Sequence, residues 1–172
     1  QLHGAKDGDK VLVKITHRGD SHFAHKVSVV NTFGSAQLAQ VCCQAVLANY
    51  NARTEFDEAT LLEAQKIAER GIPISELSER MDLTDMDIFT IDSSDSKDLD
   101  DAVSLEEDEE HFFLGVHIAD VSHYVRQGSL LDLEAYRRGT SVYYADQVIP
   151  MLPKELSNGI CSLNAGCDRL AR

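Results

Sequence analysis

The chain has 172 residues, a formal net charge of −13 and 43% hydrophobic residues, which is enough for one good core or two small ones. No run approaches the roughly 18 consecutive apolar residues of a membrane span, and no charged-then-apolar signal segment opens the chain. We therefore expect neither a membrane protein nor a secreted one. None of the four cysteines forms a CxxC pair, which favours reduced thiols and a cytoplasmic location.

The first part of the chain is predicted to form strands. Apolar side chains recur at every second position from Val11 to Ile15, the pattern of a half-buried strand. Residues 26–30 predict a second strand. The polar connection 17–25 contains three histidines without convincing metal-ligand spacing, so we expect them at the surface.

Three helices are predicted next, over Ser35–Tyr50, Asp57–Arg70 and Ser75–Met81. The serine and the aspartate that open the first two helices are expected N-caps, because their side chains accept hydrogen bonds from free N–H groups. Gly71 ends the second helix. We expect all three helices to be scaffold without chemistry.

From residue 88 onward the pattern changes to strands. The run Ile88–Ile91 predicts a buried strand, and residues 102–105 predict another. The long apolar run Phe112–Ile118 predicts a central strand. A helix is predicted over Ser129–Arg138, with a capping box at its start and a glycine after its end. A further strand is expected over residues 141–144.

The segment between the first two of these strands carries five aspartates: Asp92, Asp95, Asp98, Asp100 and Asp101. A like-charge pair about 4 Å apart costs on the order of 1 kcal/mol in water and roughly 4 kcal/mol at an effective dielectric constant of 20. Repulsion among these carboxylates would destabilise the folded loop unless cations bind there. Hard cations such as Mg²⁺ take carboxylate oxygens as ligands, and two of them clamp the reacting oxygens of a phosphodiester. The segment therefore predicts metal-dependent phosphoryl transfer.

Three other interpretations fit the acidic segment less well. A solvated acidic loop is the common case, but the flanking strands argue against it. A calcium loop of the EF-hand type needs glycine at its sixth position, and the two possible registers place lysine or valine there. An aspartyl-phosphate phosphatase would use Asp98 and Asp100, but its nucleophile follows directly on a strand, whereas Ser96-Lys97 precede Asp98.

The acidic segment, with Ile91-Asp92 and Asp98–Ala102, is followed by further motifs in a fixed order. These motifs are Gly115–Ser122, Arg138–Tyr143, Val148–Pro153 and Leu156–Leu163. Together they resemble the ribonuclease II / ribonuclease R family of exoribonucleases, whose catalytic part is the RNB domain. His117 and the segment Ser122–Val125 favour the ribonuclease R branch. His117 and His123, near Asp120, are expected to have hydrogen-bonded structural roles rather than to bind metal.

The resemblance implies an α+β fold, a partial RNB-type catalytic domain with a mixed sheet and flanking helices. A remnant of an OB or cold-shock-like β-barrel precedes it. The expected domains are the end of that barrel over 1–34, a helical connector over 35–85 and the first part of the catalytic domain over 86–172. We therefore expect a fragment that lacks a catalytic arginine and a C-terminal RNA-binding barrel.

The implied activity is processive 3′-to-5′ hydrolysis of single-stranded RNA to nucleoside 5′-monophosphates, with Mg²⁺ or Mn²⁺ as cofactor. By position, the catalytic and metal-binding residues are Asp92, Asp98, Asp100 and Asp101. Asp100 would help orient the metal and the attacking water, and Tyr143 would pack on the 3′-terminal base unless it is a core tyrosine. The alternative is a catalytically dead RNA-binding or regulatory relative. No basic channel offsets the charge of −13, and no protein partner is deducible.

Overall fold

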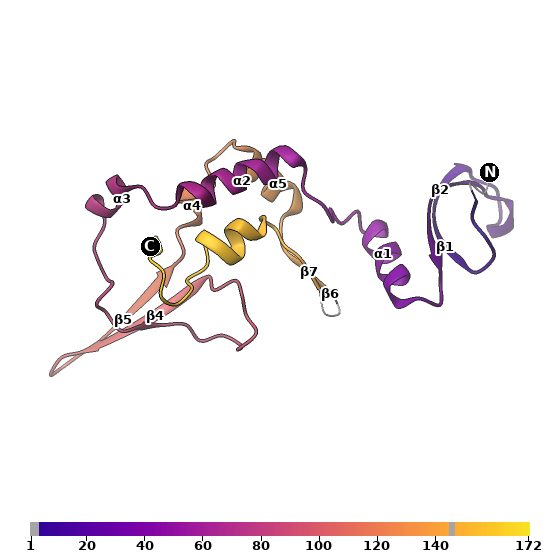
Figure 1. Ribbon diagram of the computed structural model, residues 1–172. Helices are drawn as coiled ribbons and strands as arrows, with labels where there is room; N and C mark the ends of the chain where they lie inside the picture. The colour runs from indigo at the N-terminus through magenta and orange to yellow at the C-terminus, as the bar shows by residue number, and fades with distance from the viewer. Residues whose placement is uncertain (1–3, 145–146) are drawn as a thin grey trace. The chain divides into compact units, whose positions relative to one another are not determined.

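The computed structural model of the chain describes residues 4–144 and 147–172 (Figure 1). They form two compact units. The first contains the chain up to Thr54 and the segment around Tyr143–Gln147, and the second contains Glu55–Val142 and Val148–Arg172. Helices and small antiparallel sheets occur together, so the predicted α+β class is confirmed. The three expected domain boundaries stay a prediction.

The first unit is an antiparallel hairpin with one helix against it. Strand β1 (Asp9–His17) pairs with β2 (Lys26–Ser35), and the short 3₁₀ turn η1 (His22–Ala24) lies in the connection between them. Helix α1 (Ala39–Asn49) packs against both strands. The buried apolar side chains described in this unit are Val29, Val41 and Leu47.

The start of α1 differs from the prediction. Ser35 is not its N-cap, because it is the last residue of β2 and pairs there with Asp9. The helix begins four residues later, and Leu38 occupies the N-cap position. The Ser35 Oγ atom accepts a hydrogen bond from the Gln37 N–H at 3.3 Å instead. Pairing with β1 therefore prevails over the local preference of serine for a helix start.

The second unit is built around α2 (Glu58–Arg70) and α5 (Leu130–Arg138), which contact each other, and around the helical segment η2 (Glu155–Ile160), which packs against α2. Asp57 caps α2 as predicted, accepting a hydrogen bond from the Thr60 N–H at 2.8 Å. The hydrophobic core of the second unit consists of Ala64, Tyr124, Leu131, Leu152, Leu156, Ile160, Cys161 and Leu170.

The ends of α5 are also as predicted. Ser129 Oγ accepts a hydrogen bond from the Asp132 N–H at 3.1 Å, and Gly139 adopts the left-handed conformation with φ of 73°. Within the helix, Glu134 and Arg138 form a buried ion pair at 3.0 Å. The guanidinium group of Arg138 also lies 3.6 Å from the centre of the Phe56 ring. These contacts fix the beginning of the unit to α5.

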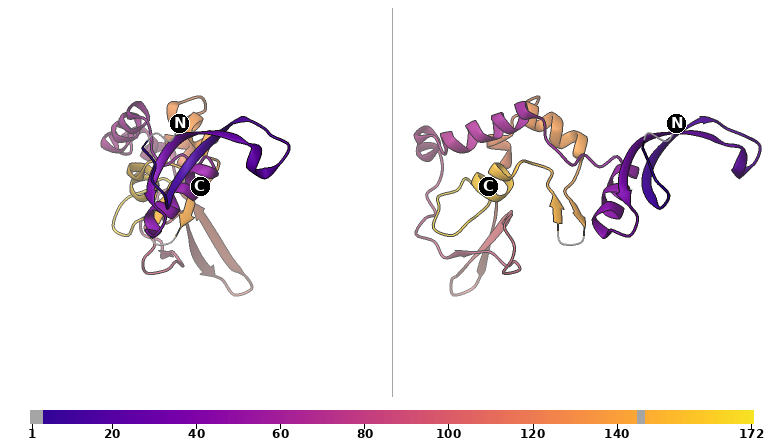
Figure 2. Two further views of the ribbon diagram at one scale, coloured as in Figure 1. Left: turned by 90° about the vertical axis from the view of Figure 1, so that its right-hand side faces the viewer. Right: turned by 45° about the vertical axis from the view of Figure 1, so that its right-hand side comes forward.

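A three-stranded antiparallel sheet extends from these helices. Its order is β3 (Ile88–Phe89), β4 (Asp101–Glu107) and β5 (Phe112–Ile118). Figure 2 shows β4 and β5 as a ribbon that leaves the helical layer. The prediction of a central Phe112–Ile118 strand is wrong, because β5 is the outer strand of this sheet and, in the described chain, only its last residue, Ile118, pairs on the other side, with Arg172. The prediction of a buried strand before the acidic segment is also wrong, because β3 has two exposed residues and Ile91 is 82% exposed.

Four shorter elements complete the described chain: α3 (Ile74–Glu79), α4 (Val121–Tyr124), β6 (Val142–Tyr144) and β7 (Gln147–Ile149), the last two forming a two-stranded sheet. Among the described residues, none of the helices is both long and apolar enough to cross a membrane. All four cysteines are free thiols. Burial raises the pKa of the Cys161 thiol to about 12, so this thiol is unreactive at neutral pH.

Candidate active site

The acidic loop, which we define as residues 92–101, runs from the end of β3 to the start of β4 without regular structure in its first nine residues. Long-range hydrogen bonds fix its second half. The Leu99 N–H donates to Ser162 Oγ at 2.9 Å, and the Leu163 N–H donates to the Leu99 carbonyl at 2.8 Å. On the other side, the Ala119 N–H donates to the Asp100 carbonyl at 2.9 Å. The loop is therefore held between η2 and the end of β5.

The four aspartates that the sequence selects act on one another electrostatically. Burial of the Asp100 carboxyl raises its pKa above the ordinary aspartate value, and the charges of Asp98, Asp101 and Asp92 raise it further, in that order. The charge of Asp100 also contributes to the raised pKa of Cys161, after burial. Asp100 is thus partly desolvated but still exposed, and the charges of the other three aspartates act on it in the same direction.

The donor chemistry of this loop fits a divalent cation. Carboxylate oxygens are ligands that Mg²⁺ and Mn²⁺ prefer. A bound cation would also offset the repulsion between aspartates that contributes to the raised pKa of Asp100. Over residues 4–144 and 147–172, however, no three His, Cys, Asp or Glu side chains are already gathered closely enough to form a ligand sphere. A bound cation would have to draw these exposed carboxylates together.

The fifth predicted site residue, Tyr143, lies on β6 and belongs to the first compact unit. Its side chain is 68% exposed. The alternative that Tyr143 is a core tyrosine is therefore wrong for this structure. Its assignment to the RNA base stays a prediction.

A second carboxylate cluster lies at the end of β5, centred on the buried Asp120. Its Oδ2 atom accepts from Arg80 at 2.7 Å, and its Oδ1 atom lies 3.0 Å from the Nε atom of Arg172. Burial by itself would raise the pKa of Asp120, but the hydrogen bonds from Arg80, Ser122 and Arg172 outweigh it and lower the pKa to about 2. The negative charge of Asp120 is therefore compensated by the two arginines.

Of the two histidines near this cluster, His117 has the hydrogen-bonded role that the sequence predicts. His117 Nε2 lies 2.9 Å from Ser104 Oγ, and Gly115 leaves room for this pair, since a Cβ atom there would lie 2.3 Å from the same Oγ. The side chain of His123 is buried, and its Nδ1 atom lies 3.4 Å from Glu76 Oε2. The partners Arg80, Arg172 and Ser162 were not predicted, because no local pattern marks a contact across 40 or more residues.

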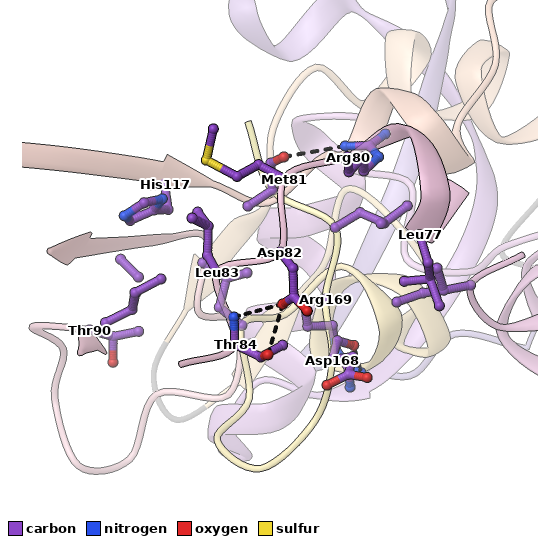
Figure 3. A pocket seen from close by; sticks show the side chains of 16 residues that line it. Leu77, Arg80, Met81, Asp82, Leu83, Thr84, Thr90, His117, Asp168 and Arg169 are labelled. Atoms are coloured by element: carbon purple, nitrogen blue, oxygen red, sulfur yellow. Dashed lines mark hydrogen bonds between the residues drawn. The ribbon is translucent and has the colours of Figure 1, made fainter. Parts of the chain in front are cut away.

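A cavity of about 610 Å³ reaches both ends of the acidic loop, since Thr90 precedes the loop, Ala102 follows it, and both line the cavity. In Figure 3, Arg80 and Leu77 lie on the opposite side of this cavity from Thr90. The size is in the range of ligand pockets. Residues from separate segments of the second unit build it, which is why the sequence did not predict it.

Comparisons with known proteins show two families along the chain. The family described as RNB domain matches residues 80–172, and the cold shock domain matches residues 1–57. Ribonuclease R 1 of Lactococcus lactis is 46% identical over 165 residues, which is 94% of this chain and 20% of that protein. The chain therefore spans about a fifth of the length of this relative.

Solved structures of ribonuclease R also resemble this chain. RNase R of Mycoplasma genitalium in complex with double-stranded RNA superimposes with a TM-score of 0.86 at 32% identity, over 97% of this chain and 30% of that one. The yeast protein Ssd1, described as a pseudonuclease, shares the fold with a TM-score of 0.64 at 17% identity, over 90% of this chain and 20% of that one. The chain belongs to the RNB-domain family of ribonuclease II and ribonuclease R.

Proposed function

We propose that this chain supplies the catalytic carboxylates of a cytoplasmic 3′-to-5′ exoribonuclease that processively hydrolyses single-stranded RNA to nucleoside 5′-monophosphates. The observation that carries the proposal is the acidic loop, in which the charges of three aspartates raise the pKa of the Asp100 carboxyl and the backbone of the second half is fixed to the core. Relatives named ribonuclease R support the reaction class. A further solved RNase R, bound to ribose-methylated single-stranded RNA, supports the substrate class.

The residues divide into two roles. Asp92, Asp98 and Asp101 would hold Mg²⁺ or Mn²⁺, directly or through water, while Asp100 would help orient the cation and the attacking water. Such a cation, when bound, neutralises charge on the phosphodiester and makes its bound water more acidic. The protein's own contribution is to fix the backbone that carries Asp98, Asp100 and Asp101, which lowers the cost of bringing their carboxylates to the cation.

The substrate contacts are expected outside the acidic loop. The exposed ring of Tyr143 is suited to stack on the 3′-terminal base. The net charge of −13 opposes a polyanion. Most of the affinity for RNA would then come from other parts of a longer protein.

The test of this function uses a chimaera of Lactococcus lactis ribonuclease R 1 in which this chain replaces the matching segment. With 5′-labelled single-stranded RNA and Mg²⁺, we expect a ladder of shortened products and release of nucleoside 5′-monophosphates. A folded chimaera that binds RNA without shortening it, beside an active parent, would contradict the proposal. That result would favour an RNA-binding relative without activity.

The 172-residue chain alone should show little or no exonuclease activity, even with Mg²⁺ or Mn²⁺. It spans about a fifth of the L. lactis relative and carries a net charge of −13. Incubation of the purified chain with the same labelled RNA checks this expectation. Mononucleotide release at a rate near that of the chimaera would show that the remaining four fifths are dispensable.

A further inference from the structure

Ser162 is a buried residue far from the acidic loop in sequence that contacts the loop directly. Its side chain is completely buried, with 0% exposure. Its hydroxyl oxygen accepts a hydrogen bond from the Leu99 N–H at 2.9 Å. The hydroxyl donates to the Lys97 carbonyl at 3.1 Å, with Asn164 Oδ1 as a second, longer acceptor at 3.3 Å. One hydroxyl therefore holds two backbone groups that lie on either side of Asp98.

The neighbouring backbone adds a third contact, because the Leu163 N–H donates to the Leu99 carbonyl at 2.8 Å. Leu99 separates Asp98 from Asp100, so both of its backbone polar groups are bound to the segment 162–163. The earlier part of the loop has a local turn instead, in which the Ser96 N–H donates to the Ser93 carbonyl at 2.9 Å. The fixed half of the loop is the half that carries Asp98, Asp100 and Asp101.

Ser162 itself rests on a rigid support. The Arg169 Nε atom donates to its carbonyl at 2.9 Å, and its own N–H donates to the Gly159 carbonyl at 3.1 Å. The two residues before it, Ile160 and Cys161, belong to the hydrophobic core. The backbone of Ser162 is therefore tied to the core.

We propose that Ser162 is a positioning residue for the divalent cation of the acidic loop, acting through the backbone of Lys97 and Leu99 rather than by touching the cation. The inference rests on the proposed function, since it concerns the same site. Groups that orient metal ligands from outside typically contribute 10-fold to 100-fold in metal affinity or activity. Without the hydroxyl, Leu99 keeps only the contact of its carbonyl with the Leu163 N–H, and the cation must order more of the loop as it binds.

The experiment measures Mn²⁺ binding to the 172-residue chain by calorimetry, in the wild type, Ser162→Ala and Ser104→Ala. Ser104 is a matched control, because it is also a buried serine, 4% exposed, and its hydroxyl bonds to His117 instead of to the loop. We expect Ser162→Ala to weaken Mn²⁺ binding about tenfold or more. Ser104→Ala should bind within about twofold of the wild type.

A second readout follows, without metal, the hydrogen bond between the Leu99 N–H and Ser162. Amide hydrogen exchange at Leu99 should become faster in Ser162→Ala and stay unchanged in Ser104→Ala, because only the first variant removes the acceptor of that N–H. In the chimaera, Ser162→Ala should raise the Mn²⁺ concentration needed for half-maximal activity and leave the KM for RNA unchanged. A residue that only stabilises the fold would not produce this separation.

Should Ser162→Ala lower the stability too far, Ser162→Thr and Ser162→Cys replace it. Both add volume, but only threonine keeps a strong hydroxyl donor and acceptor. Threonine should preserve Mn²⁺ affinity and cysteine should lose it. Equal affinity in the two variants would overturn the inference.

The failures of the two proposals are distinguishable. If the wild type binds Mn²⁺ and Ser162→Ala binds it equally well while Leu99 exchange accelerates, the positioning role is wrong and the metal site stands. If Ser104→Ala weakens binding as much as Ser162→Ala, the effect is one of general stability and the inference is also overturned. If the wild type itself binds no Mn²⁺, the metal site of the proposed function fails and the inference fails with it.

Discussion

Asp100 and Asp120 lie in the same compact unit and are both partly removed from water, yet their surroundings are opposite. Asp120 accepts hydrogen bonds from Arg80, Ser122 and Arg172, and its pKa falls to about 2. Asp100 has aspartates as neighbours, and burial and their charges raise its pKa. One carboxylate is neutralised by the protein, and the other is left with its negative charge uncompensated by arginine.

The two carboxylates are connected by a short path of backbone. The Ala119 N–H donates to the Asp100 carbonyl, and the next N–H, that of Asp120, donates to the Leu170 carbonyl at 2.8 Å. The balanced cluster thus holds the strand end against which the acidic loop is fixed. The comparison indicates a division of labour, in which Asp120 stabilises the fold and Asp100 keeps its charge available for a ligand.

The largest expected effect is on the catalytic rate, and it concerns Asp100. In the chimaera, Asp100→Asn should lower the single-turnover rate about 100-fold or more, because a positioned charge at a reacting centre contributes about 10²-fold to 10³-fold. RNA affinity should change less than about threefold, since phosphate contacts elsewhere provide it. Rapid-quench assays and filter binding measure the two quantities. Asp95→Asn removes the same charge from the same loop and should leave both nearly unchanged.

The next effect concerns stability. Asp120→Asn should lower the free energy of unfolding of the chain by about 2 kcal/mol at pH 7, because a pKa lowered from 3.8 to about 2 corresponds to that amount. Since the folded-state pKa is lowered, this contribution is present above about pH 4 and disappears as the pH falls toward 2. Urea unfolding of wild type and variant at several pH values tests the sign. The difference should vanish at the acid end, and Asp85→Asn, at an exposed position, should show no difference at any pH.

A smaller effect is expected from Tyr143. In the chimaera, Tyr143→Ala should weaken binding of short RNA about tenfold and change the length of the final undegraded fragment, because stacking on a base contributes about 1–3 kcal/mol. Gel analysis of the limit products measures the change. Tyr136→Ala is a matched control, since Tyr136 is also exposed, at 87%. An unaltered limit product with unaltered affinity would remove Tyr143 from the substrate site.

The smallest expected effect is a change in stability for Asp100→Asn that is opposite in sign to that for Asp120→Asn. Without added metal, Asp100→Asn should raise the free energy of unfolding by up to about 0.5 kcal/mol at pH 7, because it relieves repulsion among partly exposed charges. Since the folded-state pKa of Asp100 is raised, the wild type should approach the variant as the pH falls through that pKa. Chemical unfolding at pH 7 and pH 4 measures this. A loss of stability at pH 7 would mean that Asp100 is structurally neutralised, as Asp120 is.

Features that depend on neighbouring residues were predictable from the sequence. The caps Asp57 and Ser129 and the terminal Gly139 act within one helical turn, so the ends of α2 and α5 follow from local chemistry. The acidic loop was recognisable because its aspartates are contiguous. Burial was not predictable in the same way, since an apolar run such as Phe112–Ile118 has the same pattern in an edge strand as in a central one.

Long-range contacts were the part that the sequence did not reveal. Ser162 lies 63 residues from Leu99, and Arg80 lies 40 residues from Asp120. Neither partner stands out by type or spacing, because buried serines and surface arginines are common. The sequence therefore identified the carboxylates of the candidate site, while the structure was needed to find what holds them.

The central claim is that the acidic loop binds a divalent cation, and thermal unfolding of the chain in increasing Mg²⁺ tests it most directly. A ligand that binds only the folded state at ten times its dissociation constant adds about 1.4 kcal/mol, or roughly 4 °C in Tm for a chain of this size. The account predicts this rise in the wild type and its absence after Asp98→Asn with Asp101→Asn. An equal rise in the double variant, or no rise in the wild type, would contradict it.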